Sequence, residues 1–492
     1  MNTRSAGLLL SAIIALVGLF VIDMRLAVSV DPATTATTST TTTTTTTPST
    51  STTATTTTAT KAKDPGPRSG AGAAGGPIAG LTANQTKFFQ ASLIDFSEAE
   101  TVEEGLGPTM NLDSCAGCHS QPAIGGSSPA VNPQVEFAKK LGAANKLPSF
   151  ITANGPAREV RFIKNADGSP DGGVHDLFTI AGRSDAPGCA MSQPDFARAM
   201  ANKNAIFRIP TPVFGAGLIE AIPDSAIIAN QAATATQRHT FGIRGRPNIV
   251  LAGSTISGQP NTNGNDGTIA RFGWKGQNKS LLLFSGEAYN VEMGITNELF
   301  QTERNEQSTC QYDSSPNDTT NSDSVDTVGT LSAIERFSIF MRLLAPPKPS
   351  TDTPGGAPSI VRGSSVFNTV GCAACHTPTM RTGNSTVAAL RNQPVNLYSD
   401  LMLHDMGPGL ADGVSQGQAG PRDFRTAPLW GLGQRLFFLH DGRTSDLIAA
   451  IQAHASGSSR TNDASEASFV VARFNDLKET QKQDLLNFLR SR

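Results

Sequence analysis

The sequence predicts a mainly α-helical fold, with two helical domains and a large, loop-rich insertion that contains some β-structure. Apolar residues recur at helical spacing ahead of each of two short cysteine motifs and again at the end of the chain. The stretch between the motifs instead mixes short extended runs with Asn, Gly and Pro turns. The 47 Gly and 30 Pro among 492 residues add to the expected irregular structure.

The N-terminal residues are predicted to form a targeting segment followed by a linker. Arg4 precedes an uncharged run from Ala6 to Ile22, whose length lies between that of a signal-peptide core and that of a minimal membrane span. Residues 1–30 are therefore expected to be a signal peptide or an N-terminal membrane anchor, and the rest of the chain to be exported. Residues 31–84, rich in Thr, Pro and Gly, are expected to form a disordered linker, because they bury too little apolar surface to offset their ordering entropy.

Three helices and three extended runs are expected within the globular part. The helices cover residues 86–98, 332–345 and 479–492, the last with Thr480 and Gln483 as a capping box. The extended runs cover residues 158–165, 176–183 and 280–286.

Two motifs with the spacing Cys-x-x-Cys-His indicate the chemistry. They read CAGCH at residues 115–119 and CAACH at residues 372–376, whereas roughly 0.001 chance matches are expected in a chain with 6 Cys and 7 His. Two thiols about one helical turn apart can each add to a vinyl group of haem, and the histidine that follows then lies beneath the iron.

Both motifs are therefore predicted to bind haem c covalently. The expected anchors and proximal ligands are Cys115, Cys118, His119, Cys372, Cys375 and His376. A zinc site needs a second ligand pair nearby, and a thioredoxin-like pair requires no histidine, so these two alternatives fit less well. The chain is then divided into an N-terminal haem c domain with an insertion, residues 85–345, and a C-terminal cytochrome-c-like domain, residues 346–492.

The two remaining cysteines, Cys189 and Cys310, lie outside the motifs. Leftover cysteines in an oxidising compartment most often pair, so a disulfide is expected, with two free structural thiols as the alternative.

Three further blocks, at residues 206–224, 401–413 and 424–454, join the two motifs in a recognisable order. Together they resemble the di-haem oxidoreductase family, which is related to bacterial di-haem cytochrome c peroxidases and to the di-haem enzyme that matures the tryptophan cofactor of methylamine dehydrogenase. The resemblance runs from about residue 85 to the end. It implies two covalently bound haem c groups and allows a calcium ion.

The resemblance also suggests the second axial ligand of the C-terminal haem. His440 matches the histidine of a motif that the peroxidases read as PYFHDG, and their axial ligand, usually methionine, follows about four helical turns later. Here that position is His454, which with His376 would give a bis-histidine haem of lowered potential. Met406 is the competing ligand, and His404 is expected to bond a propionate or to pack beside the haem.

The N-terminal haem has two candidate distal residues. His175 is the best placed candidate for a distal ligand or distal-pocket residue, while His239 has no supporting motif and is expected to be exposed. Related peroxidases use a distal glutamate for proton transfer, for which Glu220 is the candidate, with a salt-bridged structural carboxylate as the alternative. Trp430 is expected either to lie between the two haems or to pack against one of them.

The prediction is an exported di-haem c oxidoreductase, peroxidase-like, with one electron-transfer haem and one reactive haem. A periplasmic location, an N-terminal membrane tether, a periplasmic electron-transfer partner and a small-molecule oxidant or substrate are expected. The net charge of −2 gives no indication of nucleic-acid binding. The alternatives are a non-enzymatic di-haem electron carrier and a haem-dependent oxygenase of an organic substrate.

Overall fold

A computed structural model describes residues 60–142, 147–171, 182–249, 255–256, 259–260, 268–303, 307–458 and 463–492. The predicted targeting segment, most of the predicted linker, His175 and most of the predicted run at 176–183 lie outside the described residues. Within the described part, no helix is long and apolar enough to cross a membrane.

Helices dominate the described residues, as predicted. The α-helices are α1 (Ala83–Ser97), α2 (Cys115–Cys118), α3 (Pro133–Lys140), α4 (Phe196–Ala201), α5 (Ala216–Glu220), α6 (Asp224–Ala233), α7 (Ala235–Phe241), α8 (Leu281–Met293), α9 (Ala333–Leu343), α10 (Ala357–Val370), α11 (Gly407–Leu410), α12 (Leu447–Ala453), α13 (Ser468–Asn475) and α14 (Glu479–Arg490). Short 3-10 turns are η1 (Val102–Glu104), η2 (Ser308–Cys310), η3 (Cys372–Ala374) and η4 (Ala388–Leu390).

The β-structure consists of small antiparallel pairs, which confirms the expected minor β-content. The strands are β1 (Glu159–Phe162), β2 (Ala205–Arg208), β3 (Asn248–Ile249), β4 (Thr255–Ile256), β5 (Gln259–Pro260), β6 (Ile269–Ala270), β7 (Met380–Arg381), β8 (Pro394–Val395), β9 (Leu403–Asp405) and β10 (Asp423–Arg425). They pair as β1 with β2, β3 with β6, β4 with β5, β7 with β8 and β9 with β10. In the last pair His404 lies opposite Phe424.

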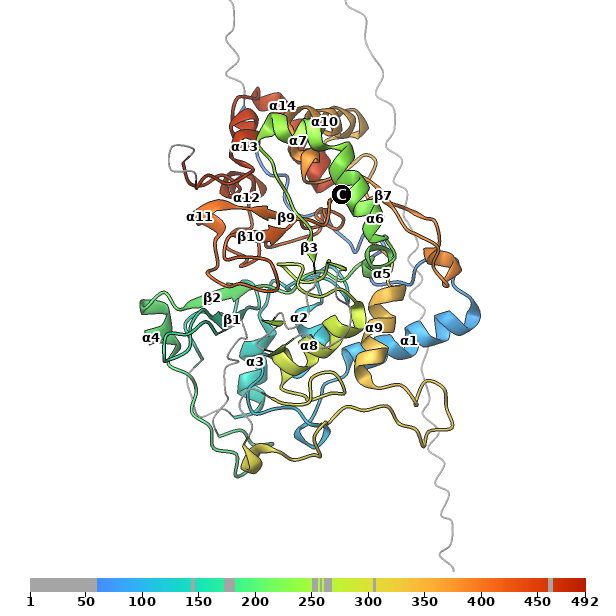
Figure 1. Cartoon of the computed structure of the whole chain (residues 1–492), viewed down its shortest axis with the longest axis vertical. Helices are drawn as coiled ribbons and strands as arrows, with labels where there is room; N and C mark the ends of the chain where they lie inside the picture. Colours follow the sequence, from blue (N-terminus) through green and yellow to red (C-terminus); the bar gives the residue numbers. More distant parts are fainter. Residues whose placement is uncertain are drawn as a thin grey trace, which may run out of the picture. The chain divides into compact units, whose positions relative to one another are not determined.

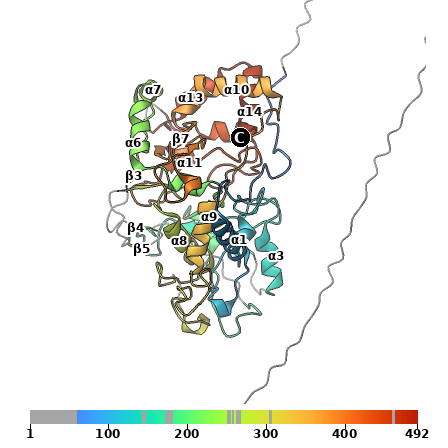
Figure 2. The ribbon, with the colours of Figure 1, turned by 90° about the vertical axis from the view of Figure 1, so that its right-hand side faces the viewer.

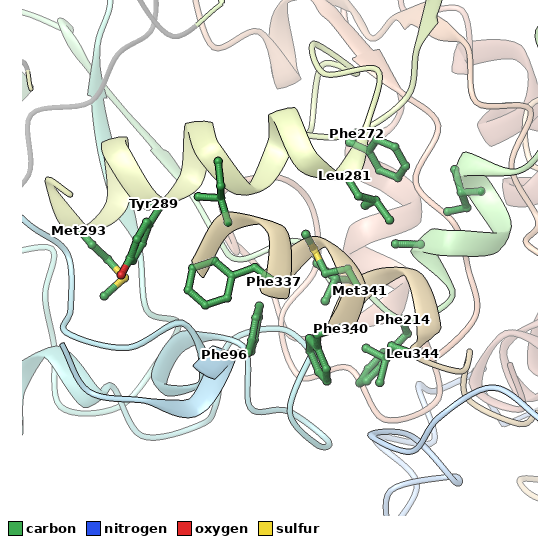
Figure 3. Packing of buried hydrophobic residues seen from close by; sticks show 14 of the residues in the cluster. Phe96, Phe214, Phe272, Leu281, Tyr289, Met293, Phe337, Phe340, Met341 and Leu344 are labelled. Carbon is green, nitrogen blue, oxygen red and sulfur yellow. The ribbon is translucent and has the colours of Figure 1, made fainter. Parts of the chain in front are cut away.

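The first hydrophobic core is built by α1, α8 and α9 around a set of aromatic rings in contact with one another. Phe96 of α1 packs 4.6 Å from Phe340 of α9 between ring centroids, and Phe337 meets Tyr289 of α8 edge to face at 5.0 Å (Figure 3). The predicted helix at 332–345 is confirmed, since α9 begins after Ser332 and buries its expected apolar face.

The second core lies among α10, α13 and α14. Phe367 of α10 packs 5.3 Å from Phe488 of α14, and Figures 1 and 2 show α10, α13 and α14 grouped apart from α1, α8 and α9. The predicted capping box of the closing helix is wrong, because the Gln481 side chain accepts from the Lys478 N–H and Thr480 lies inside the helix.

One predicted extended run is a helix instead. Residues 280–286 open α8, where the Ser280 side chain accepts from the Leu283 N–H. Most of this helix is buried, so its sequence lacks the amphipathic period that separates a helix from a short apolar strand. The run at 158–165 contains β1, as expected.

The predicted linker ends earlier than residue 84. Asp64 forms a 2.7 Å ion pair with Arg490, and both side chains are buried. Further along, Arg68 N–H donates to the Gly433 carbonyl and Ile78 N–H to the Leu343 carbonyl, each at 2.7 Å. This segment therefore runs from the second core to the first, held by specific pairs that a composition argument cannot detect.

The predicted pairing of the two leftover cysteines is confirmed. Cys189 and Cys310 form a disulfide with their Cα atoms 4.7 Å apart. Ala59–Arg492 forms one compact unit that contains two cores. These cores are not divided at residue 345, because the first includes Met402 and Trp430 and the second includes Ile243.

Candidate functional site

The first motif opens onto a cavity, called here the first cavity. Its walls come from the first motif itself, from the face of α8 that includes Tyr289 and Glu292, and from Phe337 and Met341 of α9. The single turn of α2 carries Cys115 and Cys118, and the His119 N–H donates to the Cys115 carbonyl at 3.0 Å. Both thiols and the imidazole thus line one space, as haem attachment requires.

His119 is oriented for metal ligation. Its Nδ1 lies 3.0 Å from the Gly126 carbonyl oxygen, and Phe96 packs edge-on against the ring at 6.0 Å. A ring whose Nδ1–H donates to the backbone presents Nε2 as the free ligand atom. Burial lowers the pKa of His119, which keeps the ring neutral as a ligand must be.

The second motif lines a second cavity with the same orientation of its histidine. His376 Nδ1 lies 3.0 Å from the Tyr398 carbonyl oxygen, and Phe367 packs 6.5 Å from the ring. Cys372, Cys375 and His376 all line this cavity, together with apolar residues of α10, α13 and α14. Burial lowers the pKa of His376 to about 4.

A second imidazole faces the same cavity. His454 at the end of α12 lines it, with Nδ1 2.7 Å from the Ala450 carbonyl oxygen one turn earlier. Burial lowers the pKa of His454, and His376 and His454 line the same cavity. Both present Nε2, so the geometry fits a metal held between them.

The other residues expected near this haem also line the second cavity. Met406 and His440 are on its wall, while both ring nitrogens of His404 are engaged by carboxylates, Asp400 at 2.9 Å and Glu466 at 2.8 Å. His404 also lies 3.7 Å from the Cys375 sulfur. Of the two expected positions for His404, packing beside the haem is the one that this geometry fits.

Two half-buried arginines at the second cavity form no salt bridge within the described part of the chain. Arg425 and Arg435 both line it. Arg425 donates only to the carbonyls of Gly273 and Thr426, and the Arg435 guanidinium has no partner among the described residues. Burial lowers the pKa of each to about 10, and at Arg425 the charge of Asp400 opposes this shift while the charge of Arg435 adds to it. Haem brings two propionates, whose charges would match this unpaired dyad.

The thiols do not have the chemistry of a redox pair. All four motif cysteines are free, and burial raises the pKa of Cys115 and of Cys372 to about 12. A reactive dithiol needs a lowered pKa. Among the described residues no group of three or more His, Cys, Asp or Glu side chains could hold a metal ion.

One wall of the first cavity is polar and carries two carboxyl groups. Glu159 and Glu292 both line it and are hydrogen-bonded to each other, and Asn111 also donates to Glu292. Burial and the neighbouring Glu159 raise the pKa of Glu292 well above its usual range. Arg161 holds Glu159 at 2.5 Å, so the pair consists of one carboxylate and one carboxylic acid.

Three polar atoms on the same wall are buried without a hydrogen bond. They are Gln134 Oε1, Arg208 Nε and Gln277 Oε1. Unpaired buried polar groups are costly, which indicates that this wall is built to meet polar atoms of a bound group or water.

Glu220 does not reach either cavity, so its predicted role in proton transfer is wrong. It lies at the end of α5, accepts from the Leu281 N–H at 2.8 Å and pairs with Arg342 at 2.6 Å. This is the structural alternative, in which the carboxylate fixes the start of α8. His239 is exposed on α7, as expected.

Trp274, rather than Trp430, lines both cavities. Its indole N–H donates to the Ile209 carbonyl at 2.9 Å. Trp430 lines only a smaller cavity between the two and is packed so closely on Gly215 that a Cβ there would lie 2.7 Å from its ring. The sequence offered no signal for Trp274, because its neighbours carry no motif and its contacts are all distant in the chain.

Two cavities, each with a thiol pair and a histidine with a free Nε2, define a protein built for two haems. The family model described as "Di-haem oxidoreductase, putative peroxidase" matches residues 159–492. The chain belongs to this di-haem oxidoreductase family, which implies two haem cofactors. The match begins after the first motif, so it does not cover residues 85–158 of the predicted resemblance.

Comparison with solved structures gives distant neighbours. Hydrazine synthase of Kuenenia stuttgartiensis is 16% identical, with a TM-score of 0.22, and the alignment covers 34% of this chain and 56% of that one. The diheme peroxidase BthA of Burkholderia thailandensis E264 is 15% identical, with a TM-score of 0.26, and the alignment covers 45% of this chain and 65% of that one. In both cases less than two thirds of the neighbour is spanned. No curated protein matches the chain.

Proposed function

We propose that this chain is a c-type di-haem oxidoreductase that reduces peroxide at the first cavity and stores an electron at the second. The observation that carries the proposal is the asymmetry between the cavities. The second places His376 and His454 on one space, whereas the described residues of the first supply a single imidazole, His119, together with a carboxyl pair. An iron with two imidazoles is closed to ligands, and an iron with one keeps an open position.

Residues of the first cavity supply proton transfer. Haem bound there would provide the iron that binds peroxide and passes electrons to it. Reduction of hydrogen peroxide to two waters consumes two electrons and two protons, so a proton donor must face the bound oxygen. Glu292 is suited to this role because its hydrogen bond with Glu159 requires a proton between the two carboxyl groups, and burial and Glu159 raise the pKa of Glu292 well above its usual range. Glu159, held as a carboxylate by Arg161, keeps the Glu292 carboxyl group in place, and a proton from solvent restores Glu292 after each transfer.

Residues of the second cavity would hold the haem that stores and supplies the electron. His376 and His454 would ligate the iron, and Arg425 and Arg435 would pair with the propionates. Trp274 lines both cavities and is the residue best placed to carry the electron from one to the other.

The proposed setting is extracytoplasmic. The Cys189–Cys310 disulfide and covalent haem attachment both suit an oxidising compartment. The electron donor would be a small periplasmic electron-transfer protein, and the apolar N-terminal run would be a cleaved signal or a tether.

Optical and EPR spectra of the purified di-haem protein, oxidised and half-reduced, test the proposal. We expect one high-spin and one low-spin ferric signal, with the high-spin signal alone lost on adding hydrogen peroxide. Two low-spin signals that ignore peroxide would contradict the proposal and favour an electron carrier. Oxygen uptake that depends on an organic substrate would instead favour the oxygenase.

A further inference from the structure

Tyr289 occupies a distinctive place on the wall of the first cavity. It lies on α8 one turn before Glu292, is 4% exposed and packs edge to face on Phe337 of α9 at 5.0 Å (Figure 3). Its ring therefore borders the space in which the first haem would sit. Neither proton transfer by Glu292 nor haem attachment uses it.

The Tyr289 hydroxyl has a base as its partner. It donates to Glu100 Oε1 at 2.8 Å, and Glu100 lies beyond α1, where its backbone N–H donates to the Asp113 carbonyl at 2.8 Å. The Glu100 side chain is partly exposed, so this hydrogen bond leads from the cavity wall towards solvent. A phenol that loses an electron becomes strongly acidic and must pass its proton to a nearby base, which a carboxylate at this distance can be.

The other two tyrosines in the chain lack such a partner. Tyr312 donates to the Pro187 backbone carbonyl at 2.9 Å, and Tyr398 accepts from Arg492 at 3.3 Å. Neither lines the first or the second cavity. All three tyrosines lie within the described residues. Of these, only Tyr289 both lines a haem cavity and donates to a carboxylate.

We propose that Tyr289 is a redox-active residue of the first site, oxidised by one electron after peroxide reacts there, with Glu100 as the base that takes its proton. The inference rests on the proposed function, since hydrogen peroxide is the oxidant. One electron leaves the phenol for the oxidised site, the O–H bond breaks, and the proton moves to Glu100 Oε1. The products are a neutral tyrosyl radical and a glutamic acid, and one electron from a donor with return of the proton restores both.

Glu100 makes the step depend on pH. Burial and the nearby carboxylates Glu104, Glu98 and Asp318 raise the pKa of Glu100 to about 7, against the opposing hydrogen bond from Tyr289. Cys115 also faces Glu100 but is neutral throughout this range. Only the ionised carboxylate accepts a proton, so the radical yield should rise as the pH increases through about 7.

The test is EPR of the full-length holoprotein frozen shortly after addition of hydrogen peroxide, prepared with ring-deuterated tyrosine to identify a tyrosyl signal. We expect the signal to disappear in Tyr289→Phe and to fall at least tenfold in Glu100→Gln, where the amide accepts a hydrogen bond but no proton. Tyr398→Phe and Tyr312→Phe are the matched controls and should keep it. Optical spectra of each variant confirm that both haems are in place.

The outcomes separate this inference from the proposed function. A radical that survives Tyr289→Phe, or bleaching of the haem by peroxide without any tyrosyl signal, overturns the inference and leaves the proposed function intact. If peroxide does not react at all, the proposed function fails, and a photogenerated ruthenium(III) polypyridyl oxidant then decides the inference. With that oxidant, Tyr289 should be oxidised before Tyr312 and Tyr398. Oxidation of either of the other two tyrosines first would overturn the inference.

Discussion

The two cysteine motifs place their histidines in the same way but in cavities of opposite character. In each, Nδ1 of the histidine lies 3.0 Å from a backbone carbonyl, Gly126 for His119 and Tyr398 for His376. The first cavity then adds a pair of carboxyl groups, whereas the second adds another imidazole, from His454, and two unpaired arginines. The comparison teaches that two matching motifs can meet different surroundings, so that a difference in reactivity between the sites has to come from the cavity walls and not from the motifs.

The sharpest way to separate the two sites is to remove one attachment point at a time. Cys115→Ser with Cys118→Ser should lose one of two covalent haems and all reaction with peroxide, because the reactive iron is no longer held. Cys372→Ser with Cys375→Ser should lose the other haem and the low-spin signal. Haem content by mass spectrometry and EPR measure both losses. Retention of two covalent haems in either double variant would contradict the assignment.

The next largest effect is expected from replacing the proposed proton donor of the first cavity, Glu292. Glu292→Gln should slow the reaction with peroxide by roughly 10²–10⁴-fold, because the amide keeps the hydrogen bonds but has no acidic proton. Stopped-flow absorbance of the oxidised haem measures the rate. Glu220→Gln is the control, since Glu220 lies in a salt bridge outside the cavity, and it should react at the wild-type rate. Equal slowing of both variants would assign the effect to folding.

The second cavity is tested through the midpoint potential of the haem that it would hold. His454→Met should raise the midpoint potential of the low-spin haem by on the order of 0.1 V or more, because a thioether stabilises the reduced iron relative to imidazole. The optical redox titration should leave the other haem unchanged. Met406→Leu is the matched control, since Met406 also lines the cavity. A potential that moves with Met406 instead would identify methionine as the native ligand.

A smaller change is expected from the arginine pair. Arg435→Leu should lower the potential of the same haem by on the order of 0.05 V, because a half-buried cation beside the propionates favours the reduced, less positive haem. The same titration measures it. Arg443→Leu offers a control, as that side chain is partly exposed and paired with Asp441 at 2.7 Å. An unchanged midpoint potential in Arg435→Leu would show that Arg435 does not pair with the haem propionates.

Local sequence was sufficient for the haem motifs and for some helices. The α9 helix was predictable because its apolar residues keep the helical period and a Ser332–Glu335 capping box starts it. The α8 helix was not, since a helix buried on most sides shows no such period. Glu220 was misassigned for a related reason, because a carboxylate in an apolar block can cap a helix as readily as face a cavity.

By itself the sequence predicted the two haem motifs with their histidines, the pairing of Cys189 with Cys310 and the family, because each depends on residue types at short, fixed spacing or on a small number of cysteines. Tertiary structure decided which side chains share each cavity. Glu159 meets Glu292, and Trp274 reaches both cavities, only because strands and helices distant in the chain pack together. Burial then raises the pKa of Glu292, and burial is a property of the packed fold that no local pattern contains.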